Sequence, residues 1–75
     1  MNKKRRIVIE KLLDKLIEIN DCLNEVGEEE RDAMENLPES FHNTDRYYKM
    51  QEAYDNLDEA YRSIDEAIDC LQIIE

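Results

Sequence analysis

The apolar positions of residues 52–72 repeat every seven residues. Three rows recur in register, namely Ala53, Ala60 and Ala67, then Tyr54, Tyr61 and Ile68, then Leu57, Ile64 and Leu71. Steps of three and four residues place such rows along one stripe of an α-helix, whereas a β-strand would divide them between two faces. The pattern therefore predicts a helix that packs lengthwise against another helix.

The same stripe reaches back to Met50 and Tyr47, which predicts a helix over about residues 44–74. Asn43 or Thr44 is suited to cap its N-terminus, and Asp45 falls in the first turn, where a negative charge stabilises the helix dipole.

A second stripe occupies the first half of the chain and consists of Ile9, Leu12, Leu16, Ile19, Leu23 and Val26, continued by Glu30, Ala33 and Leu37. It predicts a helix over about residues 3–36 that ends before Pro38. Leu13 and Ile17 widen the stripe beyond what one partner helix covers. Gly27 lowers helix stability by about 1 kcal/mol relative to Ala, so we expect the helix to bend or loosen there.

Two long helices joined by a short loop, at about residues 37–43, predict an all-α antiparallel hairpin. In this register Leu37 lies near Tyr47, Val26 near Leu57 and Leu16 near Ile68. One hairpin leaves Leu13, Ile17 and part of the tyrosine row uncovered. We therefore expect a homodimer that forms a four-helix bundle, or a larger oligomer.

Composition supports one small helical domain. The chain has 75 residues, and Gly27 and Pro38 are its only glycine and proline, which leaves little of the turn chemistry that a β-protein or a phosphate-binding loop requires. The formal net charge is −10, from twenty acidic and ten basic residues. Four of the basic residues are Lys3, Lys4, Arg5 and Arg6, so the remainder of the chain is strongly acidic. Direct nucleic-acid or lipid binding is therefore disfavoured.

No apolar run is long enough to span a membrane, and charged residues interrupt the apolar start before it forms a signal-peptide core. We expect a cytoplasmic protein in which Cys22 and Cys70 are reduced, because the hairpin register places them about ten residues apart. His42 is the only histidine, and no pairing of residues indicates a nucleophile or a metal site. The sequence thus predicts no enzyme activity, no metal and no cofactor.

The loop and its flanks resemble a group of small acidic proteins of phages and prophages of Gram-positive bacteria. The resemblance rests on Asn36-Leu37-Pro38-Glu39-Ser40, on Thr44, Asp45, Arg46 and Met50, and on the alanine-containing repeats, with a basic start before the first helix. Tyr47 stands where that group has glycine. The resemblance implies a phage setting, in which small non-enzymatic proteins often act against host defences.

Three surface features are candidates for binding. The first is a loop cluster of Phe41, His42, Arg46, Tyr48 and Lys49, which combines aromatic rings and positive charge at a helix N-terminus and is suited to a nucleotide. The same aromatics are equally suited to close the end of the bundle, a role expected of Tyr47.

The second feature is the basic start, Lys3 to Arg6. Positive charge is unfavourable at a helix N-terminus, so a compensating partner is expected. Asp69 and Glu75 are favoured for this role, and a phosphate-binding patch is the alternative.

The third feature is an acidic surface, with Asp55, Asp58, Glu59, Asp65 and Glu66 as its main members, flanked by Glu52, Asp69, Glu28, Glu29 and Asp32. Such a surface keeps a small bundle soluble. It is also able to imitate a phosphate backbone and occupy a nucleic-acid-binding cleft.

These observations predict a non-enzymatic phage-encoded binding protein. The leading hypothesis is a counter-defence inhibitor that sequesters a nucleotide signal of host immunity. The alternatives are an acidic nucleic-acid mimic that blocks a host defence protein, and a structural or assembly protein of the virion.

Overall fold

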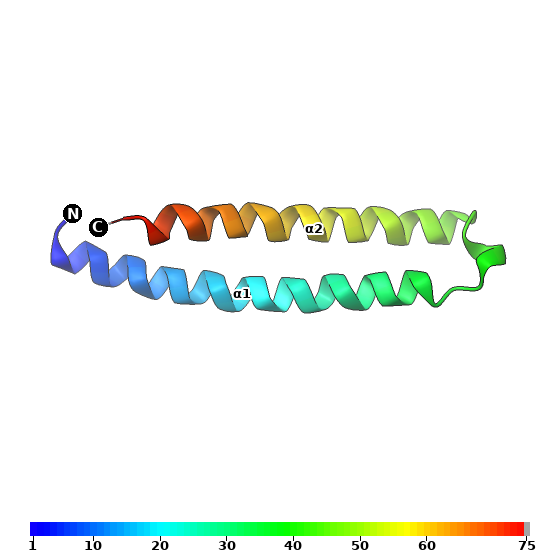
Figure 1. Cartoon of the computed structure of the whole chain (residues 1–75), viewed down its shortest axis with the longest axis horizontal. Helices are drawn as coiled ribbons and strands as arrows, with labels where there is room; N and C mark the ends of the chain where they lie inside the picture. Colours follow the sequence, from blue (N-terminus) through cyan, green and yellow to red (C-terminus); the bar gives the residue numbers. More distant parts are fainter. Residues whose placement is uncertain (75) are drawn as a thin grey trace.

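The computed structural model describes residues 1–74, and all regular structure within them is helical (Figure 1). Helix α1 spans Lys3–Glu35, the short 3-10 helix η1 spans Glu39–Phe41, and helix α2 spans Asp45–Gln72. The two long helices run antiparallel, so the start of α1 and the end of α2 lie at the same end of a rod (Figure 1). The expected antiparallel hairpin is therefore confirmed.

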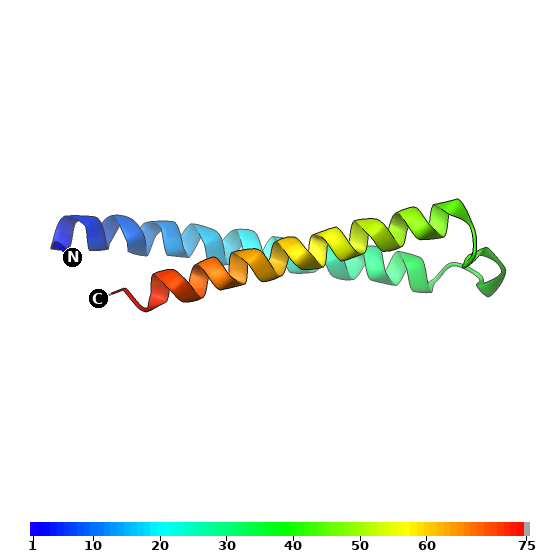
Figure 2. The same ribbon diagram turned by 90° about the horizontal axis from the view of Figure 1, so that it is seen from above.

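The rod is narrow and long. It measures 59 × 14 × 13 Å, and its radius of gyration is 17.2 Å, whereas a compact domain of this length has a radius of about 11 Å. Seen from above, the helices cross at a shallow angle near the middle of the rod (Figure 2). This is the arrangement expected when heptad rows interdigitate.

Side-chain caps begin both long helices. Asn2 Oδ1 accepts a hydrogen bond from the backbone N–H of Arg5 at 2.9 Å. Thr44 Oγ1 accepts one from the N–H of Tyr47 at 3.3 Å and donates to the carbonyl of Phe41 at 2.7 Å. Thr44, rather than Asn43, is thus the cap of α2. Helix α1 ends one residue before the predicted boundary, and α2 ends two residues before it.

The residues that pack between the two helices recur along each helix at alternating steps of three and four positions. On α2 they are Tyr47, Met50, Tyr54, Leu57, Tyr61, Ile64, Ile68 and Leu71, as predicted. On α1 they are Ile9, Leu13, Leu16, Asn20, Leu23, Gly27, Glu30 and Met34. All of these are buried or half-buried, and they are called the seam from here on.

The α1 seam corrects the predicted stripe. Leu12, Ile19 and Val26 were expected to pack against α2, but they remain 46%, 50% and 47% exposed. The row one position later is used instead, and Leu13, expected to be surplus, is part of it. The physical reason is complementary size, because the small Gly27 lies opposite the bulky Tyr54, Leu57 and Tyr61 across a hollow of about 120 Å³.

Burial within one hairpin is slight. Met34 and Ile68 are the buried hydrophobic residues of the described chain, at 8% and 7% exposure, and no large side chain is below 2%. Gly27 is buried too, and α1 continues through it without interruption, so the helix does not loosen there. The accessible surface is 6108 Å², whereas a compact monomer of this mass exposes about 4,900 Å².

Candidate functional site

The seam divides the surface of the rod into two long flanks. On one side lies a hollow of about 120 Å³, and its lining includes Asn24, Glu28 and Arg31 from α1 and Asp58 from α2. Each of these follows a seam residue by one position. Residues that precede a seam residue by one position lie about 200° around the helix from the residues that follow it, so they face the other side of the rod. The two sets define the two flanks.

The first set is called the acidic flank. It consists of Glu10, Asp14, Ile17, Asp21, Asn24, Glu28, Arg31 and Glu35 on α1, and of Tyr48, Gln51, Asp55, Asp58, Arg62, Asp65, Asp69 and Gln72 on α2. Nine of these side chains are acidic and two are basic. Residues 1–74 contain one ion pair shorter than 4.0 Å, in which Arg62 Nη2 lies 3.1 Å from Asp58 Oδ2. Most of the carboxylates on this flank thus have no ion-pair partner within the described part of the chain.

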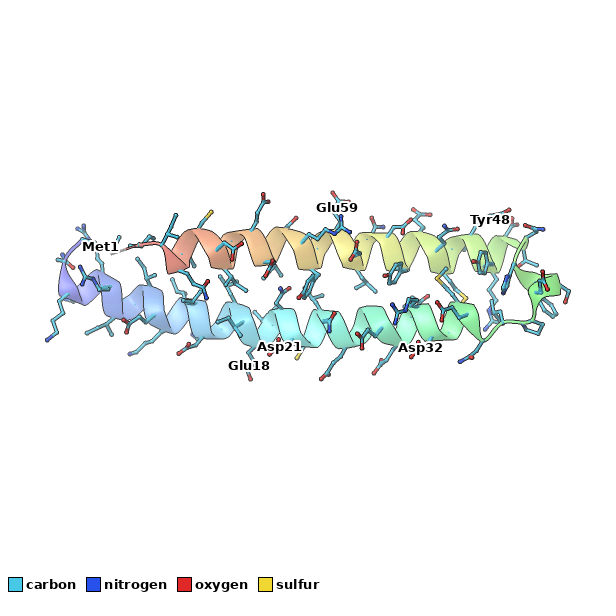
Figure 3. The ribbon with its side chains drawn as sticks, in the orientation of Figure 1. Met1, Glu18, Asp21, Asp32, Tyr48 and Glu59 are labelled. Carbon is cyan, nitrogen blue, oxygen red and sulfur yellow. The ribbon has the colours of Figure 1, made fainter. Side chains whose placement is uncertain are left out.

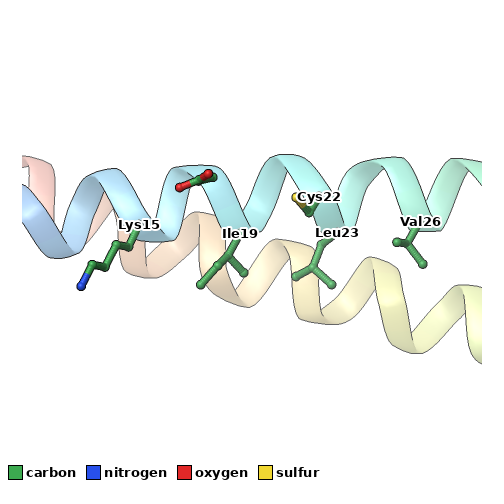
Figure 4. A pocket seen from close by; sticks show the side chains of 6 residues that line it. Lys15, Ile19, Cys22, Leu23 and Val26 are labelled. Atoms are coloured by element: carbon green, nitrogen blue, oxygen red, sulfur yellow. The ribbon is translucent and has the colours of Figure 1, made fainter.

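The second set is called the apolar flank. It consists of Val8, Leu12, Lys15, Ile19, Cys22, Val26, Glu29 and Ala33 on α1, and of Arg46, Lys49, Ala53, Asn56, Ala60, Ser63, Ala67 and Cys70 on α2. Glu29 is its one acidic residue, against three basic residues. An open groove of about 490 Å³ runs along its α1 side, where Ile19, Cys22 and Val26 follow one another (Figure 4).

The predicted acidic surface divides between two directions. Asp55, Asp58 and Asp65 belong to the acidic flank, whereas Glu59 and Glu66 precede seam residues by two positions. Glu59 points away from α1, on the outer side of the rod (Figure 3). On α1, Glu18 and Asp32 likewise point away from α2 (Figure 3). Carboxylates therefore cover the acidic flank and both outer edges of the rod.

The predicted loop cluster does not converge on one pocket. His42 is half-buried, its Nε2 lies 2.9 Å from the carbonyl oxygen of Leu37, and its ring stacks on Tyr47 at 4.7 Å between centroids. These two rings therefore close the end of the seam. Tyr48 and Lys49 are both exposed but lie on opposite flanks.

Two members of the loop cluster do meet. Phe41 and Arg46 line a hollow of about 390 Å³, together with Leu37, Pro38 and Thr44. The Tyr48 hydroxyl donates to Asn43 Oδ1 at 3.5 Å and takes no part in this hollow. The candidate nucleotide site is thereby reduced to one cation and one aromatic ring.

The basic start lies at the other end of the rod from the loop (Figure 1). Lys3, Lys4, Arg5 and Arg6 therefore do not join the loop cluster within one chain. Arg6 Nη2 donates to the carbonyl of Met1 at 3.2 Å, and Asp69 makes no ion pair with the basic start in the described part of the chain. Glu75, the other expected partner, lies outside the described residues.

Cys22 and Cys70 are free and exposed. Within residues 1–74, no three His, Cys, Asp or Glu side chains are grouped closely enough to hold a metal ion. No helix in this part of the chain is both long and apolar enough to cross a membrane.

No family model, no curated protein and no solved structure matches the sequence. The resemblance to phage proteins therefore stays a prediction. The two flanks were not foreseen, because they become visible only once the α1 seam is known. The sequence signal for them is the charge of the residues on either side of each seam position.

Proposed function

We propose that this chain is a non-enzymatic binding protein whose acidic flank occupies a basic, nucleic-acid-binding groove of another protein. The observation that carries the proposal is the segregation of charge. Nine acids and two bases lie on one flank, and one acid and three bases lie on the other. A surface whose only task was solubility would intersperse charges of both signs over both flanks.

The charge density of the flank sets the scale of the expected interaction. Nine carboxylates along a rod of 59 Å correspond to one charge per roughly 6–7 Å, about half the density of one nucleic-acid strand along its axis. The attraction is long-ranged at low ionic strength and weakens within a Debye length of about 8 Å at physiological salt. The flank therefore speeds and orients association, and its affinity falls steeply with added salt.

The proposal is tested with two variants of equal charge. The first neutralises the acidic flank with Asp14→Asn, Asp55→Asn and Asp65→Asn. The second neutralises the outer edges with Glu18→Gln, Glu59→Gln and Glu66→Gln. Each protein is immobilised, exposed to a bacterial host lysate and eluted with a salt gradient, and the retained proteins are identified by mass spectrometry.

The expected result is a retained nucleic-acid-binding protein that releases bound single-stranded oligonucleotide when the wild-type chain is added. The flank variant loses this competition, and the edge variant keeps it. Equal loss in both variants would reduce the effect to net charge, and binding that leaves the oligonucleotide in place would contradict the proposal.

A second candidate function rests on the hollow at the loop. Phe41 at the end of η1 and Arg46 in the first turn of α2 both line it, and an aromatic ring with a guanidinium is able to hold a nucleotide by stacking and by phosphate contact. Calorimetry with linear and cyclic nucleotides should then detect binding that Arg46→Ala abolishes and Arg62→Ala preserves. Absence of heat with every nucleotide would eliminate this candidate.

The biological setting follows from the resemblance to small phage proteins. In that setting the target is a defence protein in the host cytoplasm, and the chain acts as a counter-defence inhibitor. Expression of the wild-type chain in a host that carries nucleic-acid-sensing defence systems should restore phage plating. Expression of the flank variant should leave plating low. Unchanged plating with the wild-type chain across such hosts would contradict this setting. The proposed occupation of a nucleic-acid-binding groove would still be tested separately, by the competition experiment.

A further inference from the structure

The apolar flank is not covered by any other part of residues 1–74. Leu12, Ile19 and Val26 are each about half exposed, at 46%, 50% and 47%, and they follow one another along α1. On α2 the same flank carries small residues, Ala53, Ala60 and Ala67. Large side chains beside a row of small ones form a surface into which another pair of helices can pack. We propose that a second copy of this chain covers the apolar flank, with the two rods antiparallel and α1 lying on α1 of the partner copy.

The single hairpin has too little core to account for its own order. Its two buried hydrophobic residues, Met34 and Ile68, are few for a chain whose backbone ordering costs about 1–2 kcal/mol per residue. The surface of 6108 Å² exceeds that of a compact monomer by roughly 1,200 Å². A second copy of the chain would bury this excess surface. It is also the one partner that is present wherever the chain itself is present.

The flank also has the area that a stable interface requires. The rod is 59 Å long and 14 Å wide, so one face is of the order of 800 Å², which is the area each partner buries in an interface of standard size. The near absence of acidic residues on this flank fits the same conclusion, since charged residues are depleted from the centres of interfaces.

Charge along α1 selects a second copy and sets its direction. Residues 3–15 carry six basic and two acidic side chains, whereas residues 18–35 carry one basic and eight acidic side chains. An antiparallel partner therefore places the basic half of each α1 beside the acidic half of the other. A parallel partner would place like charges together, which costs affinity. The same pairing supplies the basic start, Lys3 to Arg6, with acidic partners that it lacks among residues 1–74.

Full overlap of the two α1 helices, each spanning Lys3–Glu35, puts Ile19 near the two-fold axis. In this arrangement Leu12 lies within about one turn of Val26 of the other copy. Cys22 of one copy lies about six residues, or roughly 9 Å, from Cys22 of the other along the axis. The natural cysteines are thus too far apart for a disulfide, which joins Cα atoms about 4.4–6.8 Å apart.

The first test is sedimentation equilibrium on the wild-type chain and on two matched variants. Ile19→Glu places a charge on the apolar flank, whereas Ile17→Glu places the same charge on the acidic flank two positions away. The wild type and Ile17→Glu should sediment as dimers, and Ile19→Glu should raise the dissociation constant at least ~100-fold, because each dimer loses two buried isoleucines. A monomeric wild type, a larger oligomer, or an equal response to both variants would overturn the proposal.

The second test determines direction and does not depend on the stability of Ile19→Glu. In chains with Cys22→Ser and Cys70→Ser, Leu12→Cys and Val26→Cys are made separately, isotopically distinguished, mixed and oxidised. Antiparallel pairing yields crosslinks between the two variants. Parallel pairing would instead yield crosslinks within each variant, since two copies of position 12 lie about 21 Å apart in the antiparallel dimer. Predominance of the second product, or no crosslinks at all, would refute the arrangement.

Discussion

Gly27→Ala tests how closely the two helices pack at the middle of the seam. Gly27 is buried, but a methyl group at its Cα would meet no atom within 4 Å, because the residue lies beside the hollow of about 120 Å³. Alanine is about 1 kcal/mol better than glycine inside a helix. Burial of one methyl group adds up to about 0.8 kcal/mol. Gly27→Ala should therefore raise the free energy of unfolding by about 1–2 kcal/mol.

For a domain of this size, such a change raises the melting temperature by roughly 5–10 °C. Thermal unfolding followed by circular dichroism, at one fixed protein concentration, measures the change. The matched control is the pair Glu25→Ala and Glu25→Gly, because this α1 position is exposed and lies on neither flank, so the two variants should differ by about 1 kcal/mol from helix propensity alone. If Gly27→Ala is destabilising, α2 lies closer to Gly27 than the hollow of about 120 Å³ indicates.

Three further substitutions test other parts of the hairpin. Asn20 is 4% exposed and its Oδ1 has no hydrogen-bond partner, so Asn20→Leu should stabilise the fold by about 1–3 kcal/mol in urea unfolding; a loss of stability would mean that the amide has a partner in solution. Thr44→Ala removes the cap of α2 and should cost about 1 kcal/mol in the same assay, and no cost would place the start of α2 elsewhere. The Arg62 side chain is 78% exposed in its pair with Asp58, so Arg62→Ala should change stability by less than about 0.5 kcal/mol. A larger effect would show that this pair is shielded from water.

The sequence was sufficient for the fold because two long heptad patterns and a single proline leave few alternatives. On α2 the seam was predicted correctly, since residues 51–67 contain no large apolar residue other than Tyr54, Leu57, Tyr61 and Ile64, which lie at helical spacing. For the cap of α2 the sequence left both Asn43 and Thr44 open, and the structure uses Thr44.

On α1 the seam was predicted one position wrong. Two rows share Ile9, Leu16 and Leu23, and hydrophobicity alone favours the row that contains Ile19 over the row that contains Asn20. The structure uses the less hydrophobic row, because the tyrosines of α2 need space beside them. Such a preference depends on the shapes of both helices and is not visible in either pattern alone.

The candidate sites were predicted less well than the fold. Spacing near the loop placed Arg46, Tyr48 and Lys49 together, but successive residues of a helix point about 100° apart, so Tyr48 and Lys49 reach opposite flanks. His42 was expected to join the same cluster, whereas its ring stacks on Tyr47 and closes the end of the seam. Sequence neighbours in a helix are thus poor evidence for a shared pocket.

The reactivity of Cys22 tests the central claim, that the two flanks have different partners, most directly. Cys22 lies exposed on the apolar flank of a single chain. Its modification by a soluble thiol reagent, in a Cys70→Ser background, should slow as the protein concentration is raised, because a second copy covers it. A cysteine on the acidic flank, Gln51→Cys with both natural cysteines replaced, should react at a constant rate. A Cys22 rate that is independent of protein concentration, or equal slowing at both positions, would contradict the account.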